Sequence, residues 1–179
     1  MISYNRRDVK SVSIAEEICA ELRSAGFVPY SLKYDDGKSG GLRGADSAES
    51  GEGSACMITV GGDGSIISHG KLAAQWGIPL LGVNTGRLGF MANLEPAEIK
   101  RIPDILRSEF RISRRMIMEA SITYANGDSM KQNTLNDVVV SRDSKSKLPE
   151  FCVYCGDIEV SRLRADGAIF STPTGSTAY

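Results

Sequence analysis

The chain has 179 residues, of which 41% are hydrophobic and 24% are charged, and its formal net charge is −1. This composition is that of an average globular protein and supports one or two small packed units. The near-neutral charge gives no basic field for nucleic acid or an anionic membrane surface, and no apolar stretch is long enough for a signal peptide or a spanning helix. We therefore expect a cytoplasmic protein that binds neither nucleic acid nor membrane.

Helix and strand signals alternate through the first part of the chain. Ile14, Ile18 and Leu22 recur every four residues and Gly26 follows as a C-cap, which predicts an amphipathic helix over 11–25. Short apolar runs predict strands at 2–4, 27–32, 55–60 and 79–83, and a second helix is predicted over 65–76. Residues 35–54 contain six glycines and almost nothing apolar, which predicts a mobile loop. The alternation predicts an α/β N-terminal domain with a mostly parallel open sheet.

The pattern changes near Arg111, where β-strand signals replace the alternation of helix and strand. Apolar and polar residues alternate over 116–124, Asn126-Gly127 predicts a hairpin turn, and strands are predicted at 135–140, 151–155, 158–163 and 168–172. We therefore expect an α/β domain over 1–112 and a β-rich second domain over 113–179. The strand at 168–172 has no partner strands after it, so we expect this second domain to be incomplete.

A glycine-rich segment follows the apolar run at 55–60. Residues 61–65 read Gly-Gly-Asp-Gly-Ser at the point where a buried strand would pass into a helix, the place where α/β proteins bind ligands. Glycines let backbone N–H groups approach phosphate oxygens, and Asp63 is a candidate acceptor for the proton of an attacking hydroxyl. Taken alone, the segment is equally typical of a tight turn. The chain has neither a P-loop nor a dinucleotide fingerprint between strand and helix, which disfavours P-loop kinases and Rossmann dehydrogenases.

Four further segments follow the glycine motif in a fixed order. They read Gly-Val-Asn-Thr-Gly-Arg-Leu-Gly-Phe at 82–90, Leu-Asn-Asp-Val-Val at 135–139, Arg-Ala-Asp-Gly at 164–167 and Ser-Thr-Pro-Thr-Gly-Ser-Thr-Ala-Tyr at 171–179. Together with the glycine motif, this series closely resembles the NAD kinases. The resemblance implies an enzyme that transfers a phosphoryl group from ATP or polyphosphate to the 2′-hydroxyl of NAD, uses Mg²⁺, and forms a homodimer or homotetramer.

The resemblance also assigns roles to individual residues. Asp63 would be the general base, and Gly62 and Gly64 would keep the approach of the phosphates open. The other assigned residues are Asn136 and Asp137 at ribose hydroxyls, Phe90 near the adenine, Arg164 and Lys147 at the pyrophosphate or a neighbouring chain's ligand, and Asp166, Thr174, Thr177, Ala178 and Tyr179 in the NAD pocket. His69, the single histidine, lies early in the predicted second helix, where it could reach a phosphate or simply occupy the surface. We assign no metal-ligating residue.

Each of these features also has a plainer interpretation. Asn136-Asp137 is typical of a β-turn, Arg164 of a surface charge, Phe90 of a core aromatic, and the hydroxyl residues of 171–177 of a solvated turn. Cys152 and Cys155 form a CxxC, but they fall in a predicted strand without a second pair, which indicates structural, reduced thiols.

Two other functions compete with NAD phosphorylation. Diacylglycerol and sphingosine kinases share a related Gly-Gly-Asp-Gly, although residues 174–179 and Asn136-Asp137 disfavour a lipid substrate. A truncated, non-catalytic NAD-binding fragment is the other alternative. The sequence leaves open the choice between ATP and polyphosphate, the acceptance of NADH, the oligomer size, and whether the chain is active alone.

Overall fold

A parallel sheet organises the first of two units, Met1–Arg114, in the computed structural model. Its strands are β1 (Ile2–Asn5), β2 (Ser31–Asp36), β4 (Met57–Gly61) and β5 (Leu80–Asn84), in the order β2-β1-β4-β5, with the short antiparallel β3 (Leu42–Arg43) beside β2. The structure describes residues 1–36, 42–43, 51, 53–86, 89–108 and 110–178. The predicted α/β architecture is confirmed.

The helices of this unit are α1 (Val9–Ser24), α2 (Asp63–Gln75), the 3₁₀ helix η1 (Pro96–Arg101) and α3 (Ile102–Arg107). Helix α1 begins where the Asp8 carboxylate caps the backbone N–H groups of Lys10 and Ser11, and it ends before Gly26, whose φ is +84°. None of the helices that the structure describes is long and apolar enough to cross a membrane.

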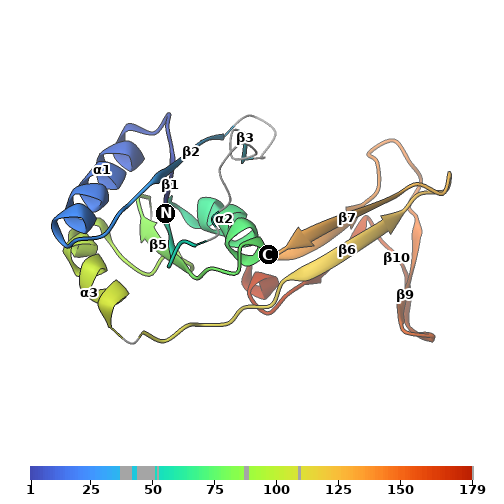
Figure 1. Ribbon diagram of the computed structural model, residues 1–179. Helices are drawn as coiled ribbons and strands as arrows, with labels where there is room; N and C mark the ends of the chain where they lie inside the picture. The colour runs from blue at the N-terminus through green and yellow to red at the C-terminus, as the bar shows by residue number, and fades with distance from the viewer. Residues whose placement is uncertain (37–41, 44–50, 52, 87–88, 109, 179) are drawn as a thin grey trace. The chain divides into compact units, whose positions relative to one another are not determined.

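Helices cover both faces of the sheet, with α1 and α3 on one side and α2 on the other (Figure 1). The apolar strand β4 serves both faces, because successive side chains of a strand point in opposite directions. Ile58 and Val60 belong to the core cluster of α1, η1 and α3, whereas Met57 packs with Ala73 of α2. This arrangement accounts for the continuous apolar run that predicted the strand.

The second predicted strand is displaced from its expected position. We predicted a strand over 27–32, but β2 begins at Ser31 and continues to Asp36. Pairing with β1 begins where Ile2 N–H donates to the carbonyl of Tyr30 at 2.8 Å, and Pro29 just before it has no N–H to donate. Of the predicted loop at 35–54, residues 37–41, 44–50 and 52 lie outside the described residues.

The strand order places β1 and β4 side by side at the centre of the sheet. Tyr4 pairs with Val60, so β1 and β4 end at the same edge. From β1 the chain crosses through α1 to β2 on one side, and from β4 it crosses through α2 to β5 on the other. The glycine motif therefore follows the carboxyl end of a strand at the topological switch point, where open α/β sheets bind ligands.

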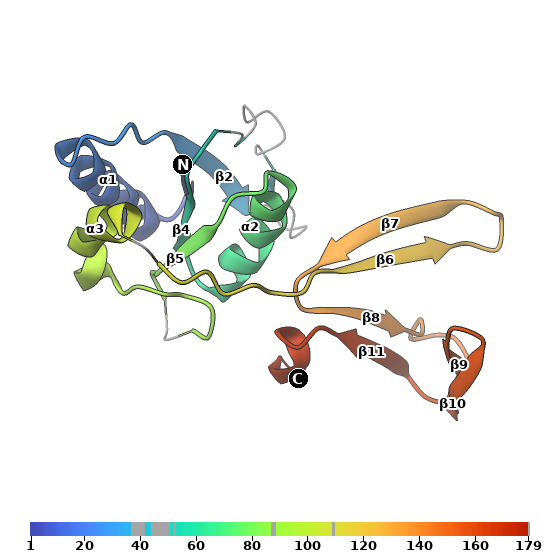
Figure 2. The same ribbon diagram turned by 60° about the horizontal axis from the view of Figure 1, so that its bottom comes forward.

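The second unit, Arg115–Tyr179, contains three antiparallel pairs of strands. They are β6 (Met118–Thr123) with β7 (Ser129–Thr134), β8 (Asp137–Ser141) with β11 (Gly167–Ser171), and β9 (Glu150–Cys155) with β10 (Ile158–Arg164). The predicted turn at Asn126-Gly127 joins β6 to β7, with φ of +90° at Gly127. Figure 2 shows β11 beside β8, ending at the short 3₁₀ helix η2 (Gly175–Thr177).

Apolar side chains of the second unit are largely exposed. Ile158 and Val160 are 71% and 61% exposed, and among the described residues of this unit only Leu135 falls in the buried hydrophobic class. Cys152 and Cys155 are free and exposed on β9. A two-stranded ribbon buries little apolar area by itself, so the backbone hydrogen bonds between paired strands are the main interactions that hold each ribbon together.

Candidate active site

The glycine motif forms the turn from β4 into α2. Gly62 is the N-cap of α2 and its carbonyl accepts the N–H groups of Ser65 and Ile66 at 3.0 and 3.1 Å. A Cβ built at Gly62 or at Gly64 would meet nothing within 4 Å. The backbone at these two positions is therefore open to a ligand, and the amino end of the helix favours an anion there.

Asp63, the first residue of α2, is held by the chain that follows β5. Its Oδ2 accepts the N–H of Phe90 at 2.8 Å and its Oδ1 accepts the N–H of Met91 at 3.1 Å. The Cα of Gly89 is so close to this carboxylate that a Cβ there would lie 2.8 Å from the Asp63 Cγ. The two backbone donors fix the direction of the carboxylate, and each oxygen keeps a second lone pair for a further donor.

A small polar cluster lies beneath the glycine turn. The Tyr34 hydroxyl donates to Ser65 Oγ at 2.9 Å, and His69 Nδ1 lies 2.7 Å from the Ser65 carbonyl. The Tyr34 and His69 rings are in contact, with centroids 4.5 Å apart. Because a Cβ at Gly61 would lie 2.7 Å from Ser65 Oγ, the glycine allows this close packing.

This cluster changes our interpretation of His69. We considered a contact with phosphate and a position on the surface, and both require an exposed side chain. His69 is instead fully buried, and its ring packs against Tyr34 of β2. The His69 ring therefore packs against the glycine turn from inside the protein, where it contacts the Ser65 carbonyl. We therefore leave His69 out of the proposed binding residues.

The loop after β5 is tied to both of its neighbours. Asn84, which is buried, accepts the Gly86 N–H at 3.1 Å and donates to Glu95 Oε1 at 3.1 Å. Lys10 of α1 donates to the Thr85 carbonyl. The side chain of Phe90, expected near the adenine, is 70% exposed in this unit, and Arg87 and Leu88 lie outside the described residues.

In the second unit, residues 171–178, which we call the closing motif, fold against Asn136. Thr172 N–H donates to the Asn136 carbonyl at 2.7 Å, and the Thr172 hydroxyl donates to the Leu135 carbonyl at 2.5 Å while accepting the Gly175 N–H at 3.2 Å. Gly175 lies so close to Asn136 that a Cβ would fall 2.6 Å from the Asn136 Cα. The structure thus joins two segments that are 36 residues or more apart in sequence.

Thr172 and Gly175 are functional candidates that we did not single out from the sequence. Both stand in the closing motif, but a threonine and a glycine give no individual signal there. Asn136 Oδ1 is buried without a hydrogen-bond partner among the described residues, so it retains its full capacity as an acceptor.

The other expected binding residues occupy different parts of the second unit. Thr174 is half-buried and accepts a hydrogen bond from Arg115 at 3.2 Å, and Thr177 and Ala178 are exposed beside it. Three other expected binding residues are Asp137 at the start of β8, Lys147 in the β8–β9 connection and Arg164 at the end of β10. Tyr179 lies outside the described residues. In the described part of the chain, no three His, Cys, Asp or Glu side chains gather as metal ligands.

Asp166 is the best-anchored of these residues. Its carbonyl accepts the backbone N–H of Arg142 at 2.9 Å, and its Oδ1 accepts Arg142 Nε at 2.6 Å. Arg142 was not among our candidates, because an isolated arginine in a sequence does not reveal which carboxylate it meets.

Comparison with known proteins gives a consistent set of relatives. The model of the ATP-NAD kinase N-terminal domain matches residues 43–110, and that of the ATP-NAD kinase C-terminal domain matches residues 135–179. An NAD kinase of Coxiella burnetii is 39% identical over 123 residues, which cover 69% of this chain and 41% of that protein. An NAD kinase of Legionella pneumophila is 40% identical over 124 residues, covering 69% and 42%.

The alignment with Treponema denticola NAD kinase extends over most of the chain. It is 37% identical over 167 residues, which cover 93% of this chain and 56% of that protein. The chain thus spans about half the length of these relatives. The crystal structure of yeast NADH kinase complexed with NADH matches all of this chain and 59% of that one, with a TM-score of 0.76 at 21% identity, and this likeness concerns the fold.

Proposed function

Since this chain belongs to the NAD kinase family, we propose that it transfers a phosphoryl group from ATP to the 2′-hydroxyl of NAD and so forms NADP. One observation carries the proposal: a half-buried carboxylate, Asp63, is oriented by two backbone N–H groups beside a glycine turn that is open to phosphates. This combination supplies a proton acceptor and an anion site within one turn of helix.

Asp63 acts in this proposal as the acceptor of the hydroxyl proton. As the proton moves to an Asp63 oxygen, the 2′-oxygen of NAD attacks the terminal phosphorus of ATP, the bond from that phosphorus to the bridging oxygen breaks, and ADP leaves. The N–H groups of Phe90 and Met91 keep the carboxylate from rotating away. Little covalent chemistry is asked of the protein, so positioning contributes most of the rate.

The glycine turn and the second unit supply the binding part of the proposal. The backbone N–H groups of Gly62 and Gly64, where a Cβ would meet nothing within 4 Å, approach the donor phosphates, and Asn136 Oδ1 accepts from a ribose hydroxyl. Asp137, Asp166, Thr174, Thr177 and Ala178 remain binding residues of the proposal, together with Phe90, Lys147, Arg164 and Tyr179.

A Mg²⁺ ion fits this set of residues because it binds chiefly through substrate phosphates and water rather than in a protein cage, and when bound it offsets charge on the triphosphate. We also propose, from the family resemblance, a cytoplasmic homodimer or homotetramer. Light scattering of the purified protein measures the oligomer size directly.

The test of the function is an NADP-forming assay on the parent chain and on Asp63→Asn. The asparagine keeps the size of the side chain and one oxygen for a backbone N–H, but it cannot take up the proton. We expect a loss of at least about 100-fold in kcat with NAD binding retained. Asp104→Asn is the matched control, because Asp104 also lies in the first turn of a helix of this unit and is exposed.

Three results would speak against the proposal. Equal turnover by Asp63→Asn and the parent chain removes the carboxylate from its role. Phosphorylation of diacylglycerol or sphingosine without phosphorylation of NAD would show that the protein is a lipid kinase. Binding of NAD without turnover, in the chain and in a longer version, identifies a non-catalytic binding protein.

A further inference from the structure

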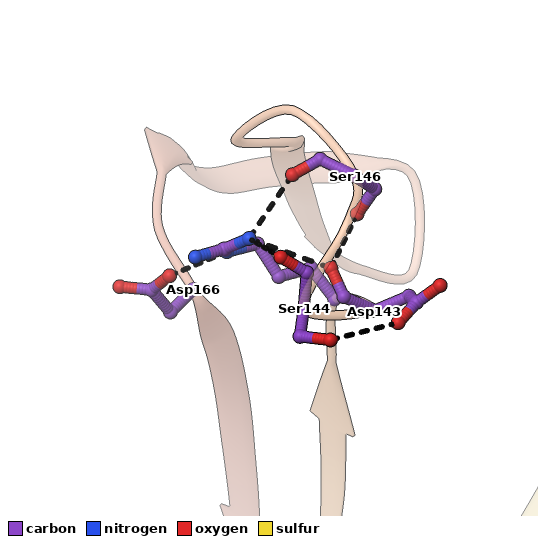
Figure 3. A network of polar contacts seen from close by, with 5 residues as sticks. Asp143, Ser144, Ser146 and Asp166 are labelled. Atoms are coloured by element: carbon purple, nitrogen blue, oxygen red, sulfur yellow. Dashed lines mark hydrogen bonds and ion pairs between the residues drawn. The ribbon is translucent and has the colours of Figure 1, made fainter.

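Arg142 stands at the centre of a hydrogen-bond network after β8. Its Nη1 donates to the carbonyls of Ser146, Ser144 and Asp143 at 3.0, 3.3 and 3.4 Å, while its Nε donates to Asp166 Oδ1 at 2.6 Å. Figure 3 shows the three loop residues and Asp166 converging on this guanidinium from two segments of chain. One side chain therefore joins the start of the β8–β9 connection to the Asp-Gly turn before β11.

The network depends on properties that only arginine has. A guanidinium carries five N–H donors in one plane, so it can serve a carboxylate along one edge and carbonyls along another. The Arg142 side chain is 30% exposed, and Asp166 holds it at both the backbone and the side chain. Within the loop, the hydroxyl of Ser146 donates to the Asp143 carbonyl at 2.8 Å, which closes the turn around the guanidinium.

Two residues that the NAD kinase proposal uses are placed by this network. Asp166 is 80% exposed with Oδ1 bound to Arg142, and Figure 3 shows its other oxygen pointing away from the network. Lys147 follows directly after Ser146, the last residue whose carbonyl Arg142 binds. One guanidinium thus holds the Asp166 carboxylate and the backbone that leads into Lys147.

We propose that Arg142 is a positioning residue for dinucleotide binding, which holds Asp166 and the loop of Lys147 in the geometry that receives NAD. The inference rests on the proposed function, because it takes NAD as the ligand. Arg142 itself does not touch the substrate. Its effect is confined to the affinity for the dinucleotide and does not extend to the phosphoryl donor.

The test compares NAD binding by calorimetry in the parent chain, Arg142→Gln and Arg142→Lys. We expect about tenfold weaker NAD binding for Arg142→Gln, since an ion-paired hydrogen bond to Asp166 is lost. Arg142→Lys should be intermediate, because an ammonium can keep the ion pair but cannot reach all three carbonyls. In the assay for NADP formation, KM for NAD should rise while KM for ATP and kcat stay unchanged.

Arg162→Gln is the matched control. Arg162, like Arg142, forms ion pairs within this unit, but its partners are Glu150 and Glu159 of the β9–β10 hairpin. Its replacement should leave NAD affinity unchanged. A double variant measures the coupling: after Asp166→Asn, the further change Arg142→Gln should cost less affinity than it does in the parent chain, because the part that acts through Asp166 is already lost.

The outcomes separate this inference from the function on which it rests. If the parent chain binds no NAD, the proposed function fails and the inference fails with it. If the parent binds NAD and Arg142→Gln binds equally well, only the inference is overturned. It is also overturned if Arg142→Gln costs as much affinity after Asp166→Asn as before it, since the arginine then does not act through Asp166.

Discussion

Replacing Gly175 by alanine tests the contact between the closing motif and Asn136. The added Cβ would lie 2.6 Å from the Asn136 Cα and closer still to its carbonyl. These are backbone atoms, so no side chain can rotate to make room. The nearest of these atoms, the Asn136 carbonyl oxygen, would lie 2.2 Å from the new Cβ, so the turn has to move by roughly 1.2 Å before the contact becomes an ordinary van der Waals contact.

Such a displacement has a cost that can be estimated. Overpacking of this kind costs about 1–3 kcal/mol, and the same free energy taken from ligand binding weakens NAD affinity about five- to 150-fold. The hydrogen bonds of Thr172 to Leu135 and Asn136 lie in the same turn and would be strained together. We therefore expect both a lower midpoint of thermal unfolding and weaker NAD binding.

Calorimetry with NAD and thermal unfolding of the same samples give the two measurements. Gly156→Ala is the control, because Gly156 has φ of +59° and nothing within 4 Å of a built Cβ. That change strains the β9–β10 turn by about 1–2 kcal/mol without touching Asn136. Gly175→Ala binding NAD as tightly as Gly156→Ala would refute the reasoning.

Three further changes have outcomes that the structure specifies. In Gly89→Ala, the new Cβ displaces the Asp63 carboxylate from its backbone donors, and we expect up to about 100-fold lower NADP formation with little change in thermal stability; an unchanged rate would contradict this. Thr172→Val leaves the Leu135 carbonyl without its donor, and we expect a loss of about 1–3 kcal/mol in the free energy of unfolding, measured with urea; Thr172→Ser, which keeps the hydroxyl, should retain most of it. Burial raises the pKa of Cys56 from 9.0 to about 11, and since the protonated thiol favours the folded state, stability should fall as the pH rises from about 9 to about 11. Cys56→Ala should remove this part of the pH dependence, and an unchanged pH dependence in that variant would argue against the buried thiol as its cause.

The sequence determined those features that depend on near neighbours along the chain. Period-four and continuous apolar runs predicted α1 and β4, because the faces that a helix or strand presents follow from local geometry. Asn126-Gly127 predicted its hairpin turn for the same reason. The local sequence pattern predicted the boundaries of elements less well. The start of β2, for example, depends on where Ile2 of β1 can begin to pair.

The ordered motifs also identified the family and named Asp63 as the candidate base. They could not show what holds its carboxylate, since Phe90 and Met91 are 27 and 28 residues away. The burial of His69 on α2 likewise follows from its contact with Tyr34, which lies 35 positions earlier on strand β2.

Only the tertiary structure decided which distant groups meet. The hydrogen bonds from Thr172 to Leu135 and from Arg142 to Asp166 span 37 and 24 residues. Such contacts depend on the register of β8 with β11, where Asp137 faces Ser171 and Ser141 faces Gly167. A sequence pattern reports which face a residue occupies, whereas strand pairing and close packing decide which residue lies opposite.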